Sequence, residues 1–269
     1  MRFYIQTFLK DLRIATSYRL QFVFSIFSIF LSLFFIFIFS SLFEGTDNLL
    51  MDKYGGSYFH FLFFGFITAE ITFLFLNTMP TKVREYQMTG IFEELIMCGK
   101  REIEVIFSSL LYPAIFQIFR LFCYLFALKI SGINLLFLEN LGFETILAFI
   151  LFAVSLIGIS LISTAVTITY KSPSIINRLY LSATSILSGV AFPVELLPKY
   201  LIFIGEIFPT TQFLKILRND SLNNSEEIFL SIESLYLMAI FSLILIVFGI
   251  FSLKKSISIA KQNGTLLLY

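Results

Sequence analysis

The sequence places two ionisable residues inside long apolar runs, where a charge is costly. Glu70 lies in the run over residues 58–80, and Arg120 lies in the run over residues 104–127. A charge inside a membrane costs about 3 kcal/mol or more unless it is paired or hydrated. On two antiparallel helices the residues would differ in depth by about one turn. We therefore predict an ion pair, with Gln117 on the same face as Arg120. A structural role is favoured, and a contact with a substrate is the alternative.

No residue pattern typical of an active site or a metal centre occurs in the chain. Gly99 and Lys100 lack the upstream glycine of a phosphate-binding loop, and no GxSxG motif is present. The only histidine, His60, has no HExxH partner, and Cys98 and Cys123 fall in different segments. We therefore expect a protein that is not an enzyme and binds no metal or cofactor itself.

The composition indicates a membrane protein. Hydrophobic residues make up 58% of the 269 residues and charged residues 14%, with a mean hydropathy of +0.89. Soluble domains average about 25% charged residues. We expect one all-α transmembrane domain over residues 1–269, opened by a basic amphipathic helix at 1–19 that lies in the membrane interface. The six expected spans are 22–43, 58–80, 104–127, 145–168, 179–192 and 234–253.

Lysine and arginine are unevenly distributed over the expected connections. Thirteen fall on one side of a six-span arrangement and five on the other. Because cytoplasmic connections carry the excess of positive charge, this predicts that both termini and the 81–103 connection are cytoplasmic. A seventh span at 198–218 would place Lys254, Lys255 and Lys261 on the wrong side.

Residues 193–218 are apolar but interrupted by Pro193, Pro198 and Pro209. Proline ends a helix or occupies its first turn. Irregular backbone at membrane depth occurs only where protein or a water-filled cavity covers it. We therefore predict that Pro193 and Pro198 end the fifth helix and start a ten-residue helix, and that Pro209 starts another that ends near Arg218. Together they form a re-entrant hairpin on the outer side, between spans five and six, which covers a vestibule.

The 81–103 connection contains a short predicted helix in the sequence TGIFEELIM. Thr89 is placed to open it, Glu93 and Glu94 lie in its first turns, and Gly99 ends it. Two turns are too short to be stable alone in water. The helix must therefore pack against the transmembrane bundle or against a cytoplasmic partner.

Small and hydroxyl residues are frequent in the fourth and fifth expected spans. Such residues allow helices to approach closely or line a polar path, and the sequence leaves both open. They are Ser155, Gly158, Ser160, Ser163, Thr164, Ser182, Ser185, Ser188 and Gly189.

Over essentially its whole length the chain resembles the permease subunits of type 2 ABC transporters, the exporters of drugs, lipids and polysaccharides. The most specific part is the outer motif at Ser188, Gly189, Phe192, Pro193, Leu197, Pro198, Pro209, Thr210 and Arg218. A second part resembles the family's ATPase-coupling segment at Glu85, Gly90, Glu93, Glu94, Leu95 and Gly99. Phe208 departs from the asparagine that the family often has before the proline.

The resemblance implies a half-transporter in the lipid bilayer. Two permease chains, expected as a homodimer, would surround a central path and work with two copies of a separate ATPase subunit that binds ATP and magnesium. The expected function is outward export of an amphipathic, lipid or glycan substrate across a bacterial inner membrane, with no nucleic-acid partner.

Two other classes remain open, an ATP-independent channel or carrier and a membrane assembly or scaffold protein. A carrier should show inverted repeats with broken spans in both halves, whereas only one half of this chain is broken. A scaffold would need neither the coupling segment nor the outer motif.

Overall fold

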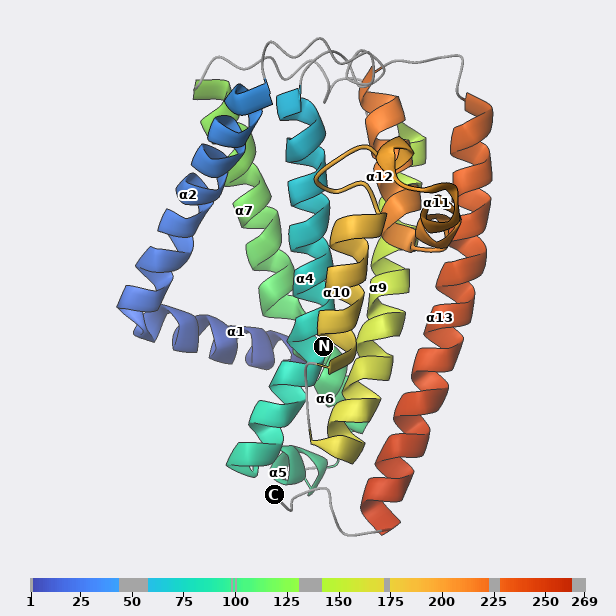
Figure 1. The fold of residues 1–269 in the computed structure, drawn as a ribbon. Coiled ribbons are helices and arrows are strands. Elements are labelled where there is room, and N and C mark those ends of the chain that lie inside the picture. The colour runs from blue at the N-terminus through green and yellow to red at the C-terminus, as the bar shows by residue number, and fades with distance from the viewer. Residues whose placement is uncertain are drawn as a thin grey trace.

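The computed structural model describes residues 2–43, 58–97, 99, 101–130, 142–171, 175–222 and 228–262. Every regular element in these residues is a helix, so the predicted all-α fold is confirmed for them. Figure 1 shows a bundle in which the long helices run side by side, with α1 (Arg2–Ser17) lying across it.

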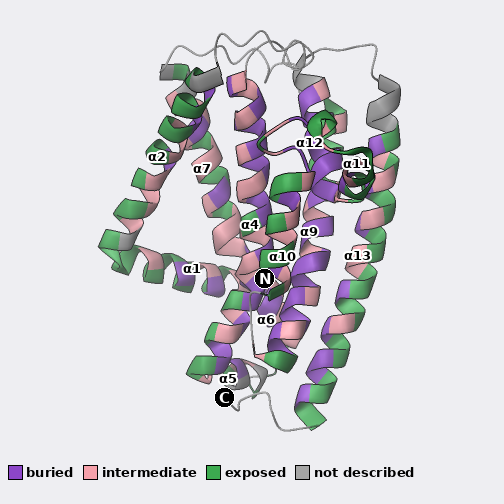
Figure 2. Cartoon of the chain, viewed as in Figure 1, coloured by how far each residue is buried: buried purple, intermediate pink, exposed green. Residues whose placement is uncertain are grey.

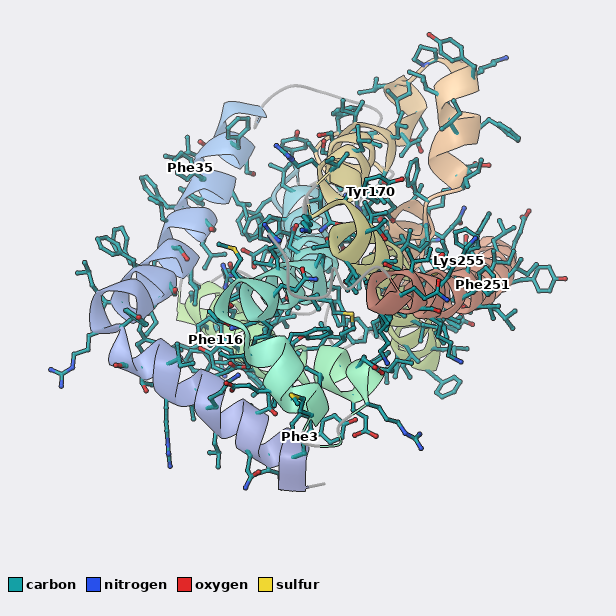
Figure 3. All side chains as sticks on the ribbon, turned by 90° about the horizontal axis from the view of Figure 1, so that it is seen from below. Phe3, Phe35, Phe116, Tyr170, Phe251 and Lys255 are labelled. Atoms are coloured by element: carbon teal, nitrogen blue, oxygen red, sulfur yellow. The ribbon has the colours of Figure 1, made fainter. Side chains whose placement is uncertain are left out.

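The bundle has two central helices and more exposed outer ones. The central pair is α4 (Tyr58–Thr89) and α9 (Phe143–Tyr170). Figure 2 shows buried residues along both, and mainly exposed residues along α2 (Arg19–Phe43) and α13 (Ile228–Gln262). Viewed along the bundle, Phe35 of α2 and Phe251 of α13 lie at its periphery (Figure 3), and both side chains are exposed. Their apolar surfaces fit a lipid environment.

Five helical segments are long and apolar enough to cross a membrane. They are Phe22–Ser41, Tyr58–Thr89, Glu102–Ala127, Phe143–Tyr170 and Glu233–Gln262. Each contains most of an expected span, so five of the six expected spans have a matching helix. The third is interrupted between α6 (Glu102–Ser108) and α7 (Leu111–Ile130). Pro113 lies in the first turn of α7, where a proline is tolerated because its missing N–H would have no partner there.

The fifth expected span differs from the prediction. The helix found there, α10 (Ile175–Leu187), has 13 residues and not the span over 179–192. At about 1.5 Å per residue it is about 20 Å long, shorter than the hydrocarbon core of a membrane. Gly189 follows its end with a φ of 73°, which a residue with a side chain rarely adopts. The apolar run continues past this glycine, but the helix does not.

Two further helices follow and meet at a sharp bend. These are α11 (Lys199–Glu206) and α12 (Pro209–Leu222), whose axes differ by 91°. A sixth crossing therefore exists only if this bent pair is counted as one broken span. By length and composition the described residues allow five or six crossings.

The amphipathic helix α1 turns a different face toward the protein than the apolar pattern suggests. Thr7 and Asp11 are its buried residues, while Ile5, Leu9 and Leu12 are exposed. Phe8 contacts the ring of Tyr112 in α7, with 6.2 Å between ring centroids. Thr7 and Asp11 thus pack on the bundle, and the exposed apolar residues of α1 are left for lipid.

The buried apolar residues form two separate blocks. We call the first the α5 block, which includes Met79, Val83, Phe92 and Leu161. The second, which includes Leu76, Phe152, Ile159 and Phe213, is called the α11 block after the end of the bundle at which it lies, although α11 contributes none of its buried residues. Along α4 the boundary falls between Leu76 and Met79. The α5 block is named for α5 (Ile91–Met97), which lies at the same end of the bundle as the last turns of α13 (Figure 1).

Helices α9 and α13 cross at close range through two glycines. A Cβ atom on Gly158 would lie 2.6 Å from the carbonyl carbon of Leu245, and one on Gly249 would lie 2.6 Å from Gly158 O. Both distances are far below van der Waals contact with main-chain atoms. The small residues of α9 therefore serve helix packing at this crossing.

Replacing Gly158 by alanine should separate α9 from α13. We expect Gly158→Ala to cost about 2–3 kcal/mol, as overpacking in a core does. Thermal unfolding of the purified protein in detergent measures this. Gly90→Ala is the control, because no atom lies within 4 Å of the added Cβ and only its φ of 74° opposes it. Equal losses in the two variants would contradict a close crossing.

Candidate functional site

The two ionisable residues predicted to pair face each other between α4 and α7. Arg120 Nη2 lies 2.7 Å from Glu70 Oε1, and the side chains are 22% and 16% exposed. The two side chains therefore meet, although the estimate from sequence put the residues about one turn apart in depth. Their charges cancel inside an apolar stretch, where either alone would be costly.

Two neutral side chains complete this cluster. Tyr124 OH donates a hydrogen bond to Glu70 Oε2 at 3.1 Å and accepts one from Arg120 Nη2 at 3.2 Å. Gln117 Nε2 lies 3.4 Å from Glu70 Oε2, on the polar face that the sequence indicated. Tyr124 was missed, although its position four residues after Arg120 puts it on the same helix face. Both carboxylate oxygens of Glu70 thus have donors, which favours a structural role over contact with a substrate.

The predicted short helix of the 81–103 connection is present as α5 (Ile91–Met97). Gly90 and Gly99 bound it with φ values of 74° and 79°. Phe92 is fully buried in the α5 block, whereas Glu94 is exposed and Leu95 is partly buried. The Glu93 side chain, Cys98 and Lys100 lie outside the described residues. Helix α5 is therefore held to the bundle by one face and presents a charged residue on another.

One detail of this segment was predicted wrongly. Thr89 does not open α5 but is the last residue of α4, where its hydroxyl donates to the carbonyl of Glu85 at 2.8 Å. Threonine bonds back to its own helix as readily as it caps the next one. The reversal at Gly90 separates α4 from α5 directly.

Helix α1 is docked onto the last turns of α4 by charged and polar contacts. Asp11 is buried, and its Oδ1 lies 3.7 Å from both Lys10 Nζ and Lys82 Nζ. Lys10 donates to Tyr86 OH at 3.0 Å, and Lys82 pairs with Glu85 at 2.9 Å. Glu85, expected at the coupling segment, thus belongs to the contact between α1 and α4. Asp11 could not be identified from the sequence, because helical periodicity assigns no partner to a single acid.

The broken segment, residues 193–218, has a helix boundary near every proline. Pro193 precedes the short 3-10 helix η1 (Val194–Leu196), Pro198 precedes α11, and Pro209 is the first residue of α12. Two predicted details were wrong. Pro193 does not end the fifth helix, since α10 already ends at Leu187, and α12 continues past Arg218 to Leu222.

The bend between α11 and α12 is held by polar side chains of the first turn of α12. Thr211 Oγ1 donates to Gly205 O and Gln212 Nε2 donates to Glu206 O, both at 2.7 Å. Thr210 Oγ1 lies 3.1 Å from Tyr180 OH of α10. Carbonyls at a helix end lack main-chain donors. Gln212 supplies a donor to Glu206 O, Thr211 adds a second donor to Gly205 O beside the N–H of Phe208, and Thr210 ties the bend to α10.

The loop between α10 and η1 lies directly on the first turns of α4. A Cβ atom on Gly65 would overlap Val190 O, and Tyr58 OH donates to Ala191 O at 2.9 Å. Arg218 Nη2 donates to Phe61 O at 3.0 Å, and its guanidinium lies 3.7 Å from the centroid of the Phe61 ring. Arg218 is thus a structural tie between α12 and α4.

The other residues of the outer motif surround the contact between Arg218 and Phe61 and are buried to different degrees. Gly189 and Pro193 are buried, Phe192 and Leu197 are partly buried, and Pro198 is exposed. A Cβ atom on Gly189 would lie 2.6 Å from Val194 Cγ2 and 3.6 Å from Arg218 Nη1. Residues far apart in the motif therefore meet at one place.

We expect removal of one partner of the Glu70–Arg120 pair to be worse than removal of both. Breaking a fully buried pair costs about 3–5 kcal/mol, and the partial exposure of these side chains lowers this to about 1–3 kcal/mol. Unfolding midpoints of Glu70→Ala, Arg120→Ala and the double variant provide the comparison. Losses that add up in the double variant would show that the residues do not interact.

Comparison with known proteins agrees with this arrangement. A sequence model of the family described as "ABC-2 type transporter" matches residues 8–220. This range contains α2 to α11 and all but the last two residues of α12, including the ion pair, α5 and the broken segment. No curated protein matches the chain. Because the family match covers well over half of the sequence, the chain belongs to the ABC-2 type transporter family and is a permease of an ABC transporter.

Proposed function

We propose that this chain is the membrane-spanning half of an exporter that is driven by a separate ATPase. The observation that carries the proposal is α5, a seven-residue helix between two glycines with positive φ, fixed to the lower part of α4 by the buried Phe92. Because α5 is short and Phe92 fixes it to α4, α5 would move only together with α4. A force applied to α5 from outside the membrane would therefore act on the long central helix of the bundle.

The distribution of charge supports a cytoplasmic position for the α5 end. Lys254, Lys255 and Lys261 are exposed on the last turns of α13, at the same end of the bundle as α5 (Figure 1). Figure 3, which views the molecule from this end, labels Lys255 on α13. Positive residues accumulate in cytoplasmic regions. With this orientation both termini are cytoplasmic and the broken segment lies toward the outer face of a bacterial inner membrane.

Two copies of the chain, in a homodimer, would enclose a path for an amphipathic, lipid or glycan substrate. The broken segment would cover the outer exit of that path, and α10 to α12 together would take the place of one full span. ATP and magnesium would be bound by two copies of the partner ATPase. An ATP-independent carrier has no use for a rigidly mounted α5, which favours the exporter.

The first test concerns α5. Reversing the charge of Glu93 and Glu94 to lysine should abolish substrate-stimulated ATP hydrolysis by the reconstituted complex, while membrane insertion is retained. The physical reason is the loss of an acidic surface on the only described helix that joins α4 to α6. Glu233→Lys is the control, because Glu233 is exposed at the other end of the bundle. Unchanged stimulation in the α5 variant would contradict the proposal.

The second test concerns the side of the broken segment. Lys199 and Lys215 are exposed on α11 and α12. A single cysteine at either position, in a chain without Cys98 and Cys123, should react with an impermeant maleimide added outside intact cells. Labelling of both positions fits a re-entrant segment. Labelling of one alone would mean that this segment crosses the membrane, and labelling only after lysis would reverse the orientation.

A further inference from the structure

The two apolar blocks of the core are separated by a small polar layer around one main-chain carbonyl. Pro80 lies inside α4 and has no N–H group, so the carbonyl of Leu76 lacks its usual main-chain donor four residues later. Asn177 Nδ2 of α10 donates to Leu76 O at 2.8 Å. Ser160 Oγ of α9 donates to the same oxygen at 3.4 Å. Three helices therefore meet at the carbonyl that Pro80 leaves without a donor.

Asn177 is the centre of this layer. Its side chain is fully buried, and Nδ2 also donates to Asn77 Oδ1 at 3.0 Å. Asn77 in turn donates to Phe73 O at 3.0 Å, which fixes the direction of its amide. The Oδ1 atom of Asn177 has no hydrogen-bond donor among the described residues. A buried amide group with an unsatisfied oxygen is destabilising, so burial alone does not explain an asparagine at this position.

The layer coincides with the boundary between the two blocks. On α4, Leu76 belongs to the α11 block and Met79 to the α5 block. On α9, Ile159 belongs to the α11 block and Leu161 to the α5 block, so Ser160 lies at the boundary. A proline inside a helix with a side-chain-satisfied carbonyl is a natural point of bending. We call this point of α4, from Leu76 to Pro80, the joint: the helix lacks one main-chain hydrogen bond there, at the place where its two cores meet.

On one side of the joint, α5 packs on the last turns of α4. Phe92, Val83 and Tyr86 are buried together in the α5 block. On the other side, α10 is joined to the broken segment. Tyr180, one turn after Asn177, bonds to Thr210 and packs edge-on against Phe208 at 5.5 Å. A Cβ atom on Gly205 of α11 would lie 2.5 Å from Leu187 O at the end of α10.

We propose that Asn177 is a positioning residue of the transport cycle, which holds the free carbonyl of Leu76 and so carries bending of α4 at Pro80 through α10 to the broken segment. This inference rests on the proposed function, in which an ATPase moves α5. Main-chain bonds within a helix pass no movement to a neighbour. A side-chain bond to a carbonyl at the joint does, because the carbonyl turns with the bend and Asn177 turns with α10.

The experiment uses the complex with its ATPase in liposomes and a cysteine at Lys199 in a chain without Cys98 and Cys123. The rate of labelling by an impermeant maleimide is compared without nucleotide and with ATP and vanadate. With a coupling of ordinary strength the two rates differ by about fivefold or more. Asn177→Leu should bring this ratio close to 1 while ATP hydrolysis and complex formation persist. Thr184→Val is the matched control, because the buried Thr184 hydroxyl bonds only within α10.

A second variant separates coupling from folding. Pro80→Ala restores the main-chain donor to Leu76 O and leaves every side chain of the polar layer in place. We expect it to lower the labelling ratio too, and the combination with Asn177→Leu to lower it no further, because both act on one bond. Should Asn177→Leu fail to accumulate, the ratio in Pro80→Ala alone decides.

The possible results distinguish failure of the Asn177 role from failure of the exporter proposal. If Asn177→Leu keeps the wild-type ratio with hydrolysis intact, the role of Asn177 is overturned and the exporter proposal is left standing. Where Asn177→Leu fails to accumulate, a wild-type ratio in Pro80→Ala with hydrolysis intact has the same meaning. Additive reductions in the double variant overturn it as well. If the wild-type chain binds no ATPase, the proposed function is wrong and the positioning role falls with it.

Discussion

The structure depends on the need of each main-chain carbonyl for a hydrogen-bond donor where water is absent. A regular helix meets this need internally, and each break in a helix leaves carbonyls that distant side chains must satisfy. Pro80 creates one such demand, which Asn177 and Ser160 meet from two other helices. The bend after α11 leaves the carbonyl of Glu206 to the side chain of Gln212, and Thr211 adds a donor to Gly205 O. Helix breaks therefore account for several of the buried polar side chains of this apolar chain.

Contacts between main-chain atoms determine where the broken segment lies. Gly65 allows the loop after α10 to touch α4, and Gly205 allows α11 to touch the end of α10. Neither contact tolerates a Cβ atom, so the helices cannot slide past one another without separating. Arg218 adds a hydrogen bond to the carbonyl of Phe61 on the same turns of α4. These turns of α4, α10 and the broken segment therefore behave as one rigid unit, and flexibility must be found elsewhere in the chain.

Hydropathy and charge were sufficient to predict α2, α4, α9 and α13, because spanning a membrane demands long apolar helices and leaves few alternatives. Counting residues also brought Glu70 and Arg120 to within about one turn of each other in depth, since helical rise is constant. The end of α10 could not be predicted, because an apolar run does not reveal that Gly189 takes a positive φ.

The sequence also did not reveal which side chains donate to which main-chain carbonyls. Pro80 signals a carbonyl without a donor at Leu76, but nothing near it in the sequence points to Asn177, about a hundred residues later. Thr211, Gln212 and Asp11 were missed for the same reason. Their roles depend on which helix ends or charges are brought beside them, and only the fold determines that.

The two ends of the bundle differ in how easily they deform. At the α5 end the ties are ion pairs with exposed members, such as Glu102 with Lys261 and Lys82 with Glu85. Exposed pairs contribute about 0–1 kcal/mol each, so rearranging them costs little. In the α11 block, Phe152 stacks on Phe213 with 4.5 Å between ring centroids, and near it Glu70 and Arg120 pair through side chains that are mostly buried. Breaking those contacts costs more. A force on α5 is therefore absorbed first by the α5 block, and the Leu76 carbonyl is the place where the deformable part of α4 meets the rigid part.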